Sequence, residues 1–316
     1  MQKNKTSSMV EAGILSAIAV VFAIVIFYIP LLGIFLNMLW PVPLILLGVR
    51  HGLKWSVMSL ITAGIILAIV VSPLQSFLQV AGLGLIGITL GYCLYKGITP
   101  SMSLFFGFIA SFISKIVLIF ANFLLIGKNP LDIDQETMNN VVSKTLELLK
   151  QYGMSEELIG KTTEHIWSVL TLMVLVIPAS IIISSIVDTF INFIASKAIL
   201  KRLGTVIPGF PSFKNWVFPH TILLLFGLSL FLFSYTQDNP ASIYFQTAMN
   251  VSSVLMFPLM IQGLAVGWFF VEEKGWHVSF KGLLVFVIFI FPQALLILGM
   301  FDYIFDFRKI HLKKRI

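Results

Sequence analysis

Long apolar stretches recur along almost the whole chain, and they limit the possible folds more than any other feature of the sequence. A helix that crosses the hydrocarbon core of a bilayer needs about 20 consecutive, mostly apolar residues. By this measure the sequence predicts nine helices, near residues 9–29, 32–49, 55–72, 74–95, 101–127, 166–196, 217–236, 242–271 and 281–303. The hydrophobic share of 58% and the mean hydropathy of +0.98 exclude an ordinary soluble protein. We therefore predict an all-α, multi-pass integral membrane protein.

Two prolines interrupt the second apolar stretch, and a basic turn closes it. Pro41 and Pro43 free backbone carbonyls that lipid cannot satisfy, so this helix must start late, kink, or be covered by protein where it is broken. Arg50, His51 and Gly52 then mark its exit into water, where Gly52 is free to adopt a left-handed backbone conformation. By the positive-inside rule this exit is cytoplasmic.

The other cations follow the same rule, with one exception. If the N-terminus is cytoplasmic, eleven Lys and Arg residues fall at inner positions and four in the outer segment 128–165. This distribution predicts a protein of the bacterial cytoplasmic (inner) membrane with its N-terminus in the cytoplasm. Nine crossings would place the five cations of the C-terminal tail outside. Either the tail is an exception to the rule, or one of the last three helices does not cross.

Residues 128–165 form the one long polar segment, with seven acids against four lysines. We predict a six-helix membrane domain at residues 1–203, with this segment as an outer loop, and further membrane helices with a basic tail at residues 204–316. An approximate helical stripe of apolar residues in the loop allows one face to lie on the bundle or on lipid headgroups. We interpret the loop as a surface connector, with a lid over an outward-facing pocket as the alternative.

The first helix carries small side chains at four-residue spacing, at Ala12, Ser16, Ala19 and Ala23. Such a face allows a second helix to approach its backbone closely. It serves either internal packing or the docking of a partner protein, and the sequence leaves both open. Four glycines between residues 82 and 91 favour internal packing of the fourth helix.

Ionisable residues at membrane depth are costly, so they are the natural candidates for a binding site. Lys115 lies midway along the fifth predicted helix, and Asp188 lies in the inner half of the sixth, with Asn192 one turn later on the same face. We predict an ion pair between Lys115 and Asp188, with a Lys115 that is satisfied by backbone carbonyls or a wet cavity as the alternative. Gln79 and Asn122 are further candidates for ligand binding, although hydrogen bonds between helices also explain such residues.

Sequence signatures of several enzyme classes are missing. The chain has no Walker-type glycine loop, no His-Glu-x-x-His run and no Gly-x-Ser-x-Gly elbow. The single Cys93 and the five scattered histidines give no spacing typical of metal ligands. Inner loops and lipid headgroups explain the net charge of +7, without a nucleic-acid partner. We therefore expect no enzymatic activity, no cofactor, no metal site and no nucleic-acid binding.

The N-terminal features together resemble a known group of membrane proteins. A small-residue first helix is followed by Pro41-x-Pro43, then by Gly48-x-Arg50-x-Gly52, then by a glycine-rich fourth helix. In this combination residues 9–200 are similar to the substrate-binding S components of energy-coupling factor (ECF) vitamin transporters. Nearly the whole chain, including Gly299-Met300-Phe301-Asp302 and Asp306-Phe307-Arg308, resembles the YybS-like family of bacterial membrane proteins.

The resemblance implies a six-helix unit with both ends in the cytoplasm and a small-molecule site that opens outward. It also implies that the face of the first helix docks a transmembrane coupling subunit driven by ATPases. The long loop before the sixth helix and about three further helices depart from ordinary S components. We expect a subunit that binds or transports a small solute and is energised by a partner, with a non-transporting scaffold or assembly factor as the alternative.

Overall fold

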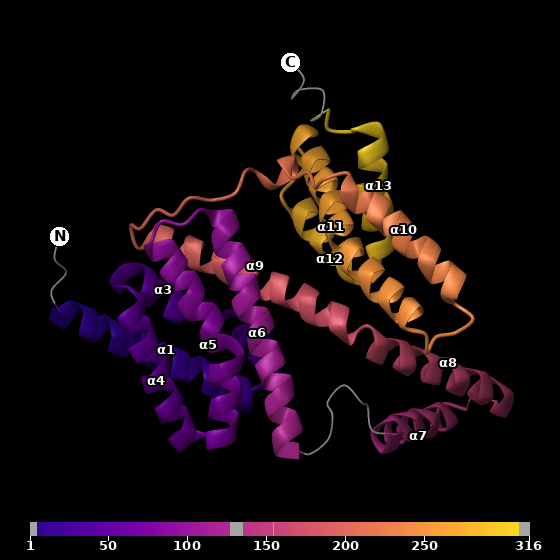
Figure 1. Ribbon diagram of the computed structural model, residues 1–316, viewed down its shortest axis with the longest axis horizontal. Coiled ribbons are helices and arrows are strands. Elements are labelled where there is room, and N and C mark those ends of the chain that lie inside the picture. The colour runs from indigo at the N-terminus through magenta and orange to yellow at the C-terminus, as the bar shows by residue number, and fades with distance from the viewer. Residues whose placement is uncertain (1–4, 127–134, 154, 310–316) are drawn as a thin grey trace. The chain divides into compact units, whose positions relative to one another are not determined.

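The computed structural model describes residues 5–126, 135–153 and 155–309, and the regular elements within these ranges are helices (Figure 1). The N-terminal helices are α1 (Lys5–Tyr28), α2 (Pro30–Leu39), α3 (Val42–His51), α4 (Leu53–Val70), α5 (Pro73–Tyr95) and α6 (Pro100–Ile126). The later helices are α7 (Gln135–Gln151), α8 (Glu156–Leu175), α9 (Ile177–Arg202), α10 (Thr221–Thr236), α11 (Ile243–Glu273), α12 (Ser279–Ile290) and α13 (Pro292–Phe305), with a 3-10 turn at Phe213–Asn215. The described residues thus have the predicted all-α class.

The chain forms two compact units. Unit 1 comprises Met1–Pro130 and Ser184–Gly209, and unit 2 comprises Leu131–Ile183 and Phe210–Ile316. The sequence division at residue 203 falls close to the end of unit 1. The sequence analysis assigns residues 131–183 to the first domain, whereas the structure groups them with unit 2. Within unit 2, α7 packs on α8, and α8 contacts α11.

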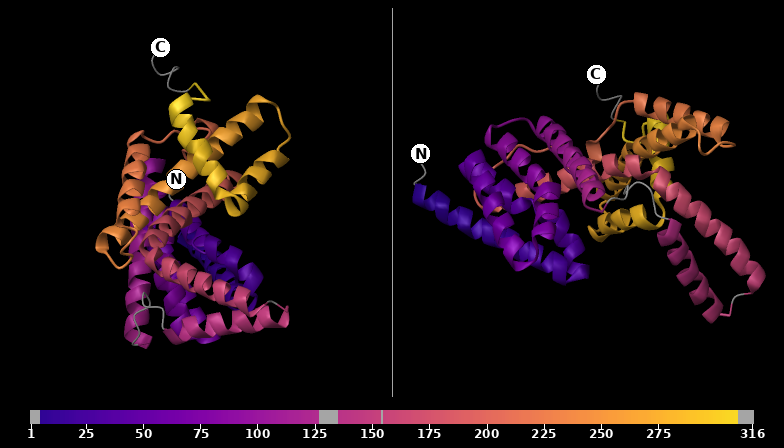
Figure 2. Two further views of the ribbon diagram at one scale, coloured as in Figure 1. Left: turned by 90° about the vertical axis from the view of Figure 1, so that its right-hand side faces the viewer. Right: turned by 60° about the horizontal axis from the view of Figure 1, so that its bottom comes forward.

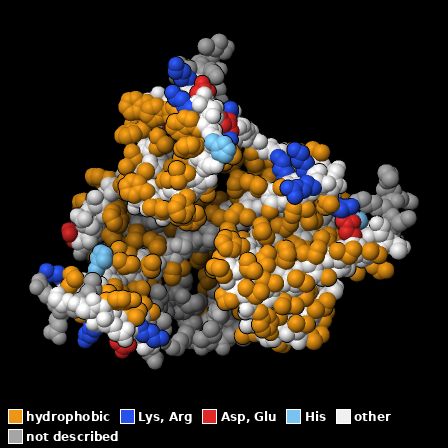
Figure 3. All heavy atoms as spheres, turned by 180° about the vertical axis from the view of Figure 1, so that it is seen from behind, with side chains coloured by type: hydrophobic (Ala, Val, Ile, Leu, Met, Phe, Trp, Pro, Cys, Tyr) orange, Lys and Arg blue, Asp and Glu red, His pale blue; other side chains and the backbone are white. Residues whose placement is uncertain are grey.

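Within the described ranges, seven helical segments are long and apolar enough to cross a membrane. They are Thr6–Tyr28, Pro30–His51, Leu53–Val70, Pro73–Tyr95, Pro100–Leu124, Ile177–Arg202 and Ile243–Glu273. Six of them contribute to unit 1, and the seventh, α11, belongs to unit 2. Hydrophobic side chains cover broad areas of the surface, as Figure 3 shows for one face, which is the arrangement that lipid contact requires. The protein is therefore a multi-pass membrane protein.

Three of the nine predicted helices are not continuous: the second, whose break was expected, and two others, both of which are interrupted next to a proline. The helix predicted at 166–196 is two helices, α8 and α9, which meet at Val176, two residues before Pro178. The helix predicted at 281–303 is the pair α12 and α13, which bends by 109° at Phe291. Proline removes a backbone donor and clashes with the preceding turn, and the apolar pattern alone does not reveal how far the helix then bends.

The break predicted in the second apolar stretch is present. Helix α2 ends at Leu39, Trp40 and Pro41 form a turn, and α3 starts at Val42 with Pro43 in its first turn. Both prolines are buried, so the broken segment is covered by protein, as an interrupted helix in lipid requires. Helix α3 ends at Gly52, whose φ of +87° is the positive value that favours glycine.

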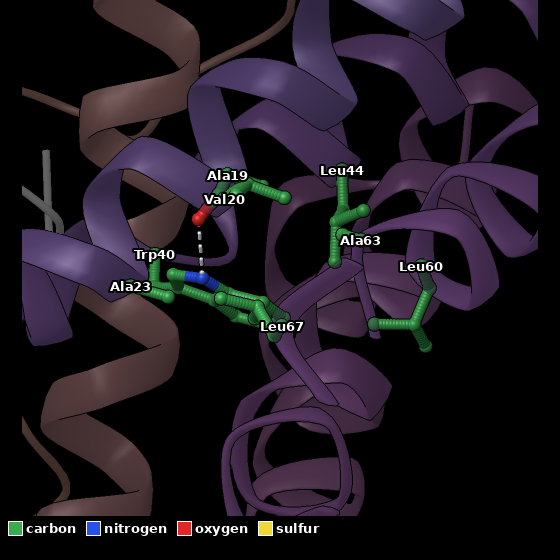
Figure 4. Close-up of a cluster of buried hydrophobic side chains, with 8 residues drawn as sticks. All are labelled: Ala19, Val20, Ala23, Trp40, Leu44, Leu60, Ala63 and Leu67. Atoms are coloured by element: carbon green, nitrogen blue, oxygen red, sulfur yellow. Dashed lines mark hydrogen bonds between the residues drawn. The ribbon is translucent and has the colours of Figure 1, made fainter. Parts of the chain in front are cut away.

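The core of unit 1 forms around Trp40 (Figure 4). Its indole Nε1 donates a hydrogen bond to the Ala19 carbonyl oxygen at 2.9 Å, and its ring packs among small and aliphatic side chains of α1 and α4. The members of this cluster are Ala19, Val20, Ala23, Trp40, Leu44, Leu60, Ala63 and Leu67. The small face of α1 is therefore occupied from within the unit.

This internal packing extends along all four small residues of α1. Ala12, Ser16, Ala19 and Ala23 are buried, and the Ser16 hydroxyl is 2.7 Å from the Ser59 hydroxyl of α4. The structure thus uses this face for internal packing. The face is therefore not accessible for docking the coupling subunit that the resemblance implies. The reason is that alanine and serine let α4 and the Trp40 turn approach the α1 backbone closely.

Glycines bring α3 and α5 together, as expected for the glycine-rich helix. A Cβ atom added to Gly48 would lie 2.8 Å from the Gly91 Cα, and one added to Gly87 would lie 2.8 Å from the Leu44 Cβ. Real Cβ atoms do not approach so closely, so the two helices keep this separation only with glycine at these positions.

Unit 2 has a separate core, in which α11 and α13 cross with their backbones in contact. A Cβ atom added to Gly263 would lie 1.9 Å from the Leu295 carbonyl oxygen, and one added to Gly299 would lie 2.0 Å from the Leu259 carbonyl oxygen. Helix α10 completes this core through Phe226, which packs with Leu259 and Tyr303.

The polar segment folds as a helical hairpin in its described part. Helices α7 and α8 lie side by side within unit 2, as two views show (Figure 2). Val142 of the predicted apolar stripe is buried, whereas Val141, Leu148 and Tyr152 are exposed. Residues 127–134 and 154, which include two of the seven acids, lie outside the described residues.

Candidate functional site

Lys115 and Asp188 form the predicted ion pair. The Lys115 Nζ lies 2.5 Å from the Asp188 Oδ2 and donates a second hydrogen bond to the Ser111 hydroxyl, one turn earlier on α6, at 2.9 Å. Both side chains keep 21% of their surface exposed. Because Lys115 lies on α6 and Asp188 on α9, the pair joins two helices of unit 1 at membrane depth.

Asn192 lies one turn after Asp188 and connects α9 to the broken second helix. Its Nδ2 donates to the Met38 carbonyl oxygen at 3.0 Å and to the Asp188 carbonyl oxygen at 2.8 Å. Met38 belongs to the last turn of α2, where the helical ladder stops. One side-chain amide thus satisfies a carbonyl beside the break and holds α9 against it.

Three buried polar atoms near this pair have no hydrogen-bond partner among the described residues. They are the Ser114 Oγ, the Asn192 Oδ1 and the Ser196 Oγ. Each unsatisfied buried group costs about 1–3 kcal/mol, so such atoms are uncommon and need an explanation. Asn192 and Ser196 continue the Asp188 face of α9 at four-residue spacing, and Ser114 lies three residues after Ser111, the serine that accepts from Lys115 on α6.

We call these residues the polar seam: Ser111, Ser114 and Lys115 of α6 with Asp188, Asn192 and Ser196 of α9. Helices α6 and α9 approach each other closely one turn before Ser111. A Cβ atom added to Gly107 would lie 2.5 Å from the Thr189 Cγ2. The polar seam combines a cation, an anion, two hydroxyls and an amide oxygen that have remaining hydrogen-bonding capacity. This combination suits the recognition of a polar small molecule.

The other two residues predicted for ligand binding lie outside the polar seam. Gln79 is buried on α5, and its Nε2 donates to the Asn37 Oδ1 at 3.3 Å, close to the α2–α3 break. The Asn122 Nδ2 donates to the Leu118 carbonyl oxygen of its own helix at 2.9 Å. Both side-chain amides thus form hydrogen bonds within the protein and lie apart from the polar seam.

The basic turn binds a residue that the sequence analysis did not single out. Glu11 of α1 accepts from the Arg50 guanidinium at 2.7 Å and contacts the His51 Nε2 at 2.7 Å, while the His51 Nδ1 lies 2.8 Å from the Ser8 hydroxyl. A signal was available, because Glu11 is the first acidic residue of the chain and no other occurs before residue 132. This network fastens the start of α1 to the end of α3.

A second buried charge pair lies in unit 2, and the sequence analysis named its residues only as part of the family resemblance. The Arg308 Nη2 donates to the Asp302 Oδ2 at 2.6 Å, and the Arg308 Nη1 donates to the carbonyl oxygens of Lys214 and Trp216 at 2.7 and 2.8 Å. The Gln262 Nε2 donates to the same carboxylate at 3.0 Å. Both charged side chains are almost completely buried, and their hydrogen bonds hold α13 against α11 and the chain before α10.

The polar seam of unit 1 is the better candidate for a ligand site, because the polar groups of the unit 2 network are already hydrogen-bonded to one another and to backbone carbonyls. Within the described residues, no group of three or more His, Cys, Asp or Glu side chains has an arrangement that could hold a metal ion.

Comparisons with known proteins cover nearly the whole chain. Residues 17–303 match the family described as predicted membrane protein (DUF2232). The chain is also similar to the uncharacterized protein YybS of Bacillus subtilis (strain 168), with 22% identity over 309 residues, covering 96% of this chain and 98% of that protein. No solved structure matches. From the extent of the family match, the chain belongs to the DUF2232 family of predicted membrane proteins.

Proposed function

We propose that this protein binds a small polar solute at the polar seam of unit 1, as a binding or transport subunit, without catalysing a reaction. The observation that carries the proposal is the set of three buried polar atoms without partners beside an intramembrane ion pair. Polar groups at membrane depth are retained mainly where they contact a pathway, a cavity or a ligand. A solute that hydrogen-bonds to these atoms would remove their cost.

We further propose that the protein is of the S-component type and that its N-terminus is cytoplasmic. A subunit of the S-component type, energised by a partner with ATPases, agrees with the resemblance of residues 9–200, and a cytoplasmic N-terminus in the inner membrane agrees with the cation distribution. Because the small face of α1 is buried, such a partner would have to bind elsewhere. The outward apolar residues of α1, among them Met9, Ile14 and Val21, are exposed and available to lipid or to a partner.

The test begins with gentle purification and mass spectrometry of small molecules that are released when the protein is denatured. Saturable binding of the identified molecule is then measured for the wild type, Ser114→Ala and Ser196→Ala. Neither hydroxyl has a hydrogen-bond partner among the residues that the structure describes, so these variants remove no hydrogen bond seen there. If the hydroxyls contact the solute, each variant should weaken binding by about tenfold, the equivalent of one hydrogen bond.

The matched control is Ser229→Ala on α10, a buried serine whose hydroxyl donates to the Phe226 carbonyl oxygen within unit 2. Its affinity for the solute should equal that of the wild type. Equal affinities in all four proteins, or no bound small molecule at all, would remove the polar seam as the binding site.

A non-transporting scaffold or assembly factor is the second candidate, and unit 2 supports it. The buried charges of that unit are satisfied by its own residues, so the unit has the properties of a structural module. Recovery of a specific protein complex without any bound small molecule from the same purification would favour this function.

A further inference from the structure

Helices α12 and α13 are joined at the single residue Phe291, and the chain changes direction there by 109°. They have 12 and 14 residues, which at 1.5 Å per residue makes them about 18 and 21 Å long. The hydrocarbon core of a bilayer is about 30 Å thick. Neither helix spans it alone, and the bend prevents the two from acting as one straight crossing.

The start of the pair is fixed to the end of α11. The Lys281 Nζ lies 2.8 Å from the Glu272 Oε1, and it lies 4.9 Å from the centroid of the Trp268 ring. The Lys214 Nζ binds the other oxygen of Glu272 at 2.8 Å. Positions 214, 272 and 281 therefore share one end of unit 2. Lysine together with tryptophan is typical of a membrane–water interface.

The end of the pair returns to the same place. Arg308, three residues after α13, donates to the carbonyl oxygens of Lys214 and Trp216, and it is buried. Asp306 and Lys309 have φ values of 44° and 52°, so the chain turns sharply on both sides of this anchor. The segment before α10 thus binds Arg308 just after the pair directly, and it is linked to Lys281 at the start of the pair through Glu272.

The middle of the pair reaches only part of the way along α11. Leu284 of α12 lies beside Gly267, and Gly299 of α13 crosses α11 at Gly263. Gly263 is ten residues from the end of α11 at Glu273, a distance of about 15 Å along the axis. The contacts of the pair with α11 therefore stay in the half of unit 2 that carries Glu272.

The opposite end of unit 2 has a different character. Helix α10 lies along α11 from Gln262 to Phe245: the Phe218 amide just before α10 donates to the Gln262 side chain, and the Phe233 ring near its end stacks on Phe245. The turn that follows contains Gln237, Asp238 and Asn239, and no Lys or Arg occurs between residues 215 and 273. The part of unit 2 formed by α10 to α13 therefore has a cationic end, with Lys214, Lys274 and Lys281, and a turn with one acid at the other end.

We infer that α12 and α13 form a re-entrant helical pair, which enters and leaves the bilayer at the cationic end of unit 2. Lys309 then lies on the same side as Lys214 and Lys274. With α10, which has 16 residues and is about 24 Å long, counted as a crossing beside the seven long segments, the described residues cross eight times and both ends of the described chain share one side of the membrane. This topology removes the conflict between nine crossings and a basic C-terminal tail, because the tail now obeys the positive-inside rule.

The test uses single cysteines in a Cys93→Ser background of the full-length protein. His277→Cys marks the cationic end of unit 2, Asn239→Cys marks the opposite turn, and Lys309→Cys reports the side that follows α13. All three positions are exposed. A membrane-impermeant maleimide is added to right-side-out and to inside-out vesicles.

Positions 277 and 309 should label in one vesicle orientation, and position 239 in the other. Labelling of 309 together with 239 would show that the pair crosses the membrane and would overturn the inference. A second readout does not depend on cysteine reactivity: the full chain is fused at its C-terminus to a fluorescent protein or to alkaline phosphatase. Fluorescence without phosphatase activity should accompany cytoplasmic labelling at 277, and the reverse combination would contradict the re-entrant pair.

Discussion

Two ion pairs, Lys115–Asp188 and Asp302–Arg308, are built in different ways. The Asp302–Arg308 pair is almost fully buried, and a glutamine and two backbone carbonyls share its hydrogen bonds. The Lys115–Asp188 pair is one-fifth exposed and lies on helices that carry polar atoms without partners. A saturated network rigidifies its surroundings, whereas an incompletely satisfied one keeps capacity for a ligand.

The coupling between Lys115 and Asp188 can be measured with a double-mutant cycle. Lys115→Met or Asp188→Leu alone leaves one unpaired charge at membrane depth and should reduce the free energy of unfolding by about 3 kcal/mol. The double variant should lose less than either single variant, because no charge remains uncompensated. Thermal unfolding in detergent provides the measurement, and simply additive losses would show that the two side chains do not interact.

Arg308 is predicted to be irreplaceable by lysine. Its guanidinium contacts the Asp302 carboxylate through two nitrogens and two carbonyl oxygens through a third, which an ammonium group cannot reproduce. Arg308→Lys and Arg308→Met should both lower the melting temperature of the detergent-purified protein by several degrees. Lys309→Met, at the exposed neighbouring position, should leave it unchanged. A lysine variant as stable as the wild type would contradict the role assigned to the planar group.

At the scale of helices, three breaks beside prolines shape the fold, and the protein stabilises two of them with asparagine. Asn192 donates to the Met38 carbonyl oxygen next to the α2–α3 break. Asn250 of α11 donates to the Leu175 carbonyl oxygen and accepts from the Ala179 amide, so it replaces the helical bond between these two residues at the α8–α9 break. The third break, at Phe291, bends α13 by 109° from the direction of α12.

Removing the Asn250 amide tests this explanation of the α8–α9 break. Asn250→Leu leaves the Leu175 carbonyl and the Ala179 amide without the asparagine, which should cost about 1–3 kcal/mol of unfolding free energy. Thr247→Val, an exposed change on the same helix, is the control and should be neutral. If both variants melt at the wild-type temperature, water or lipid satisfies these backbone groups equally well.

The crossing of α11 and α13 should tolerate no added methyl group. Gly263→Ala and Gly299→Ala place a Cβ atom within 2.0 Å of a carbonyl oxygen, so the helices must separate, at a cost of about 1–3 kcal/mol or more. Gly282→Ala on α12 is the matched control, because its Cβ atom has no neighbour within 4 Å. Comparison of thermal unfolding distinguishes them, and a destabilised Gly282→Ala together with unaffected crossing variants would refute the close contact.

For the whole molecule, orientation follows from the distribution of charge. We predict that Arg50, Lys96 and Lys201 lie on the cytoplasmic side and that Glu147 lies outside. Arg50 is engaged with Glu11, so cysteines at 96, 201 and 147 report the topology without disturbing that pair. An impermeant thiol reagent applied to intact cells should label position 147 and spare the other two. Labelling at 96 or 201 would reverse the orientation.

Local sequence predicted those parts of the structure that depend on neighbours along the chain. Pro41 and Pro43 break the second helix and Gly52 has a positive φ, because ring geometry and the missing Cβ atom act within one turn. The Lys115–Asp188 pair was also predictable, since an apolar helix offers a charged residue few partners. The roles of Asn122, which bonds within its own helix, and of the small face of α1, which packs inside unit 1, could not be predicted from the sequence. Hydrophobic periodicity does not identify which neighbour a residue will contact.

The sequence by itself determined that this protein is helical and membrane-embedded, and that its second apolar stretch is interrupted at Pro41 and Pro43, because lipid requires each segment to satisfy its own backbone hydrogen bonds. The breaks at Val176 and Phe291 were visible only in the structure. Only the tertiary structure decided what those interruptions do. The break at Pro178 is bridged by Asn250, 71 residues beyond Ala179, and the chain that returns after the bend before Pro292 is anchored through Arg308 to residues more than 90 positions earlier. Proline frees backbone groups locally, but the direction of the chain afterwards depends on distant side chains that satisfy them, and a one-dimensional pattern does not contain those contacts.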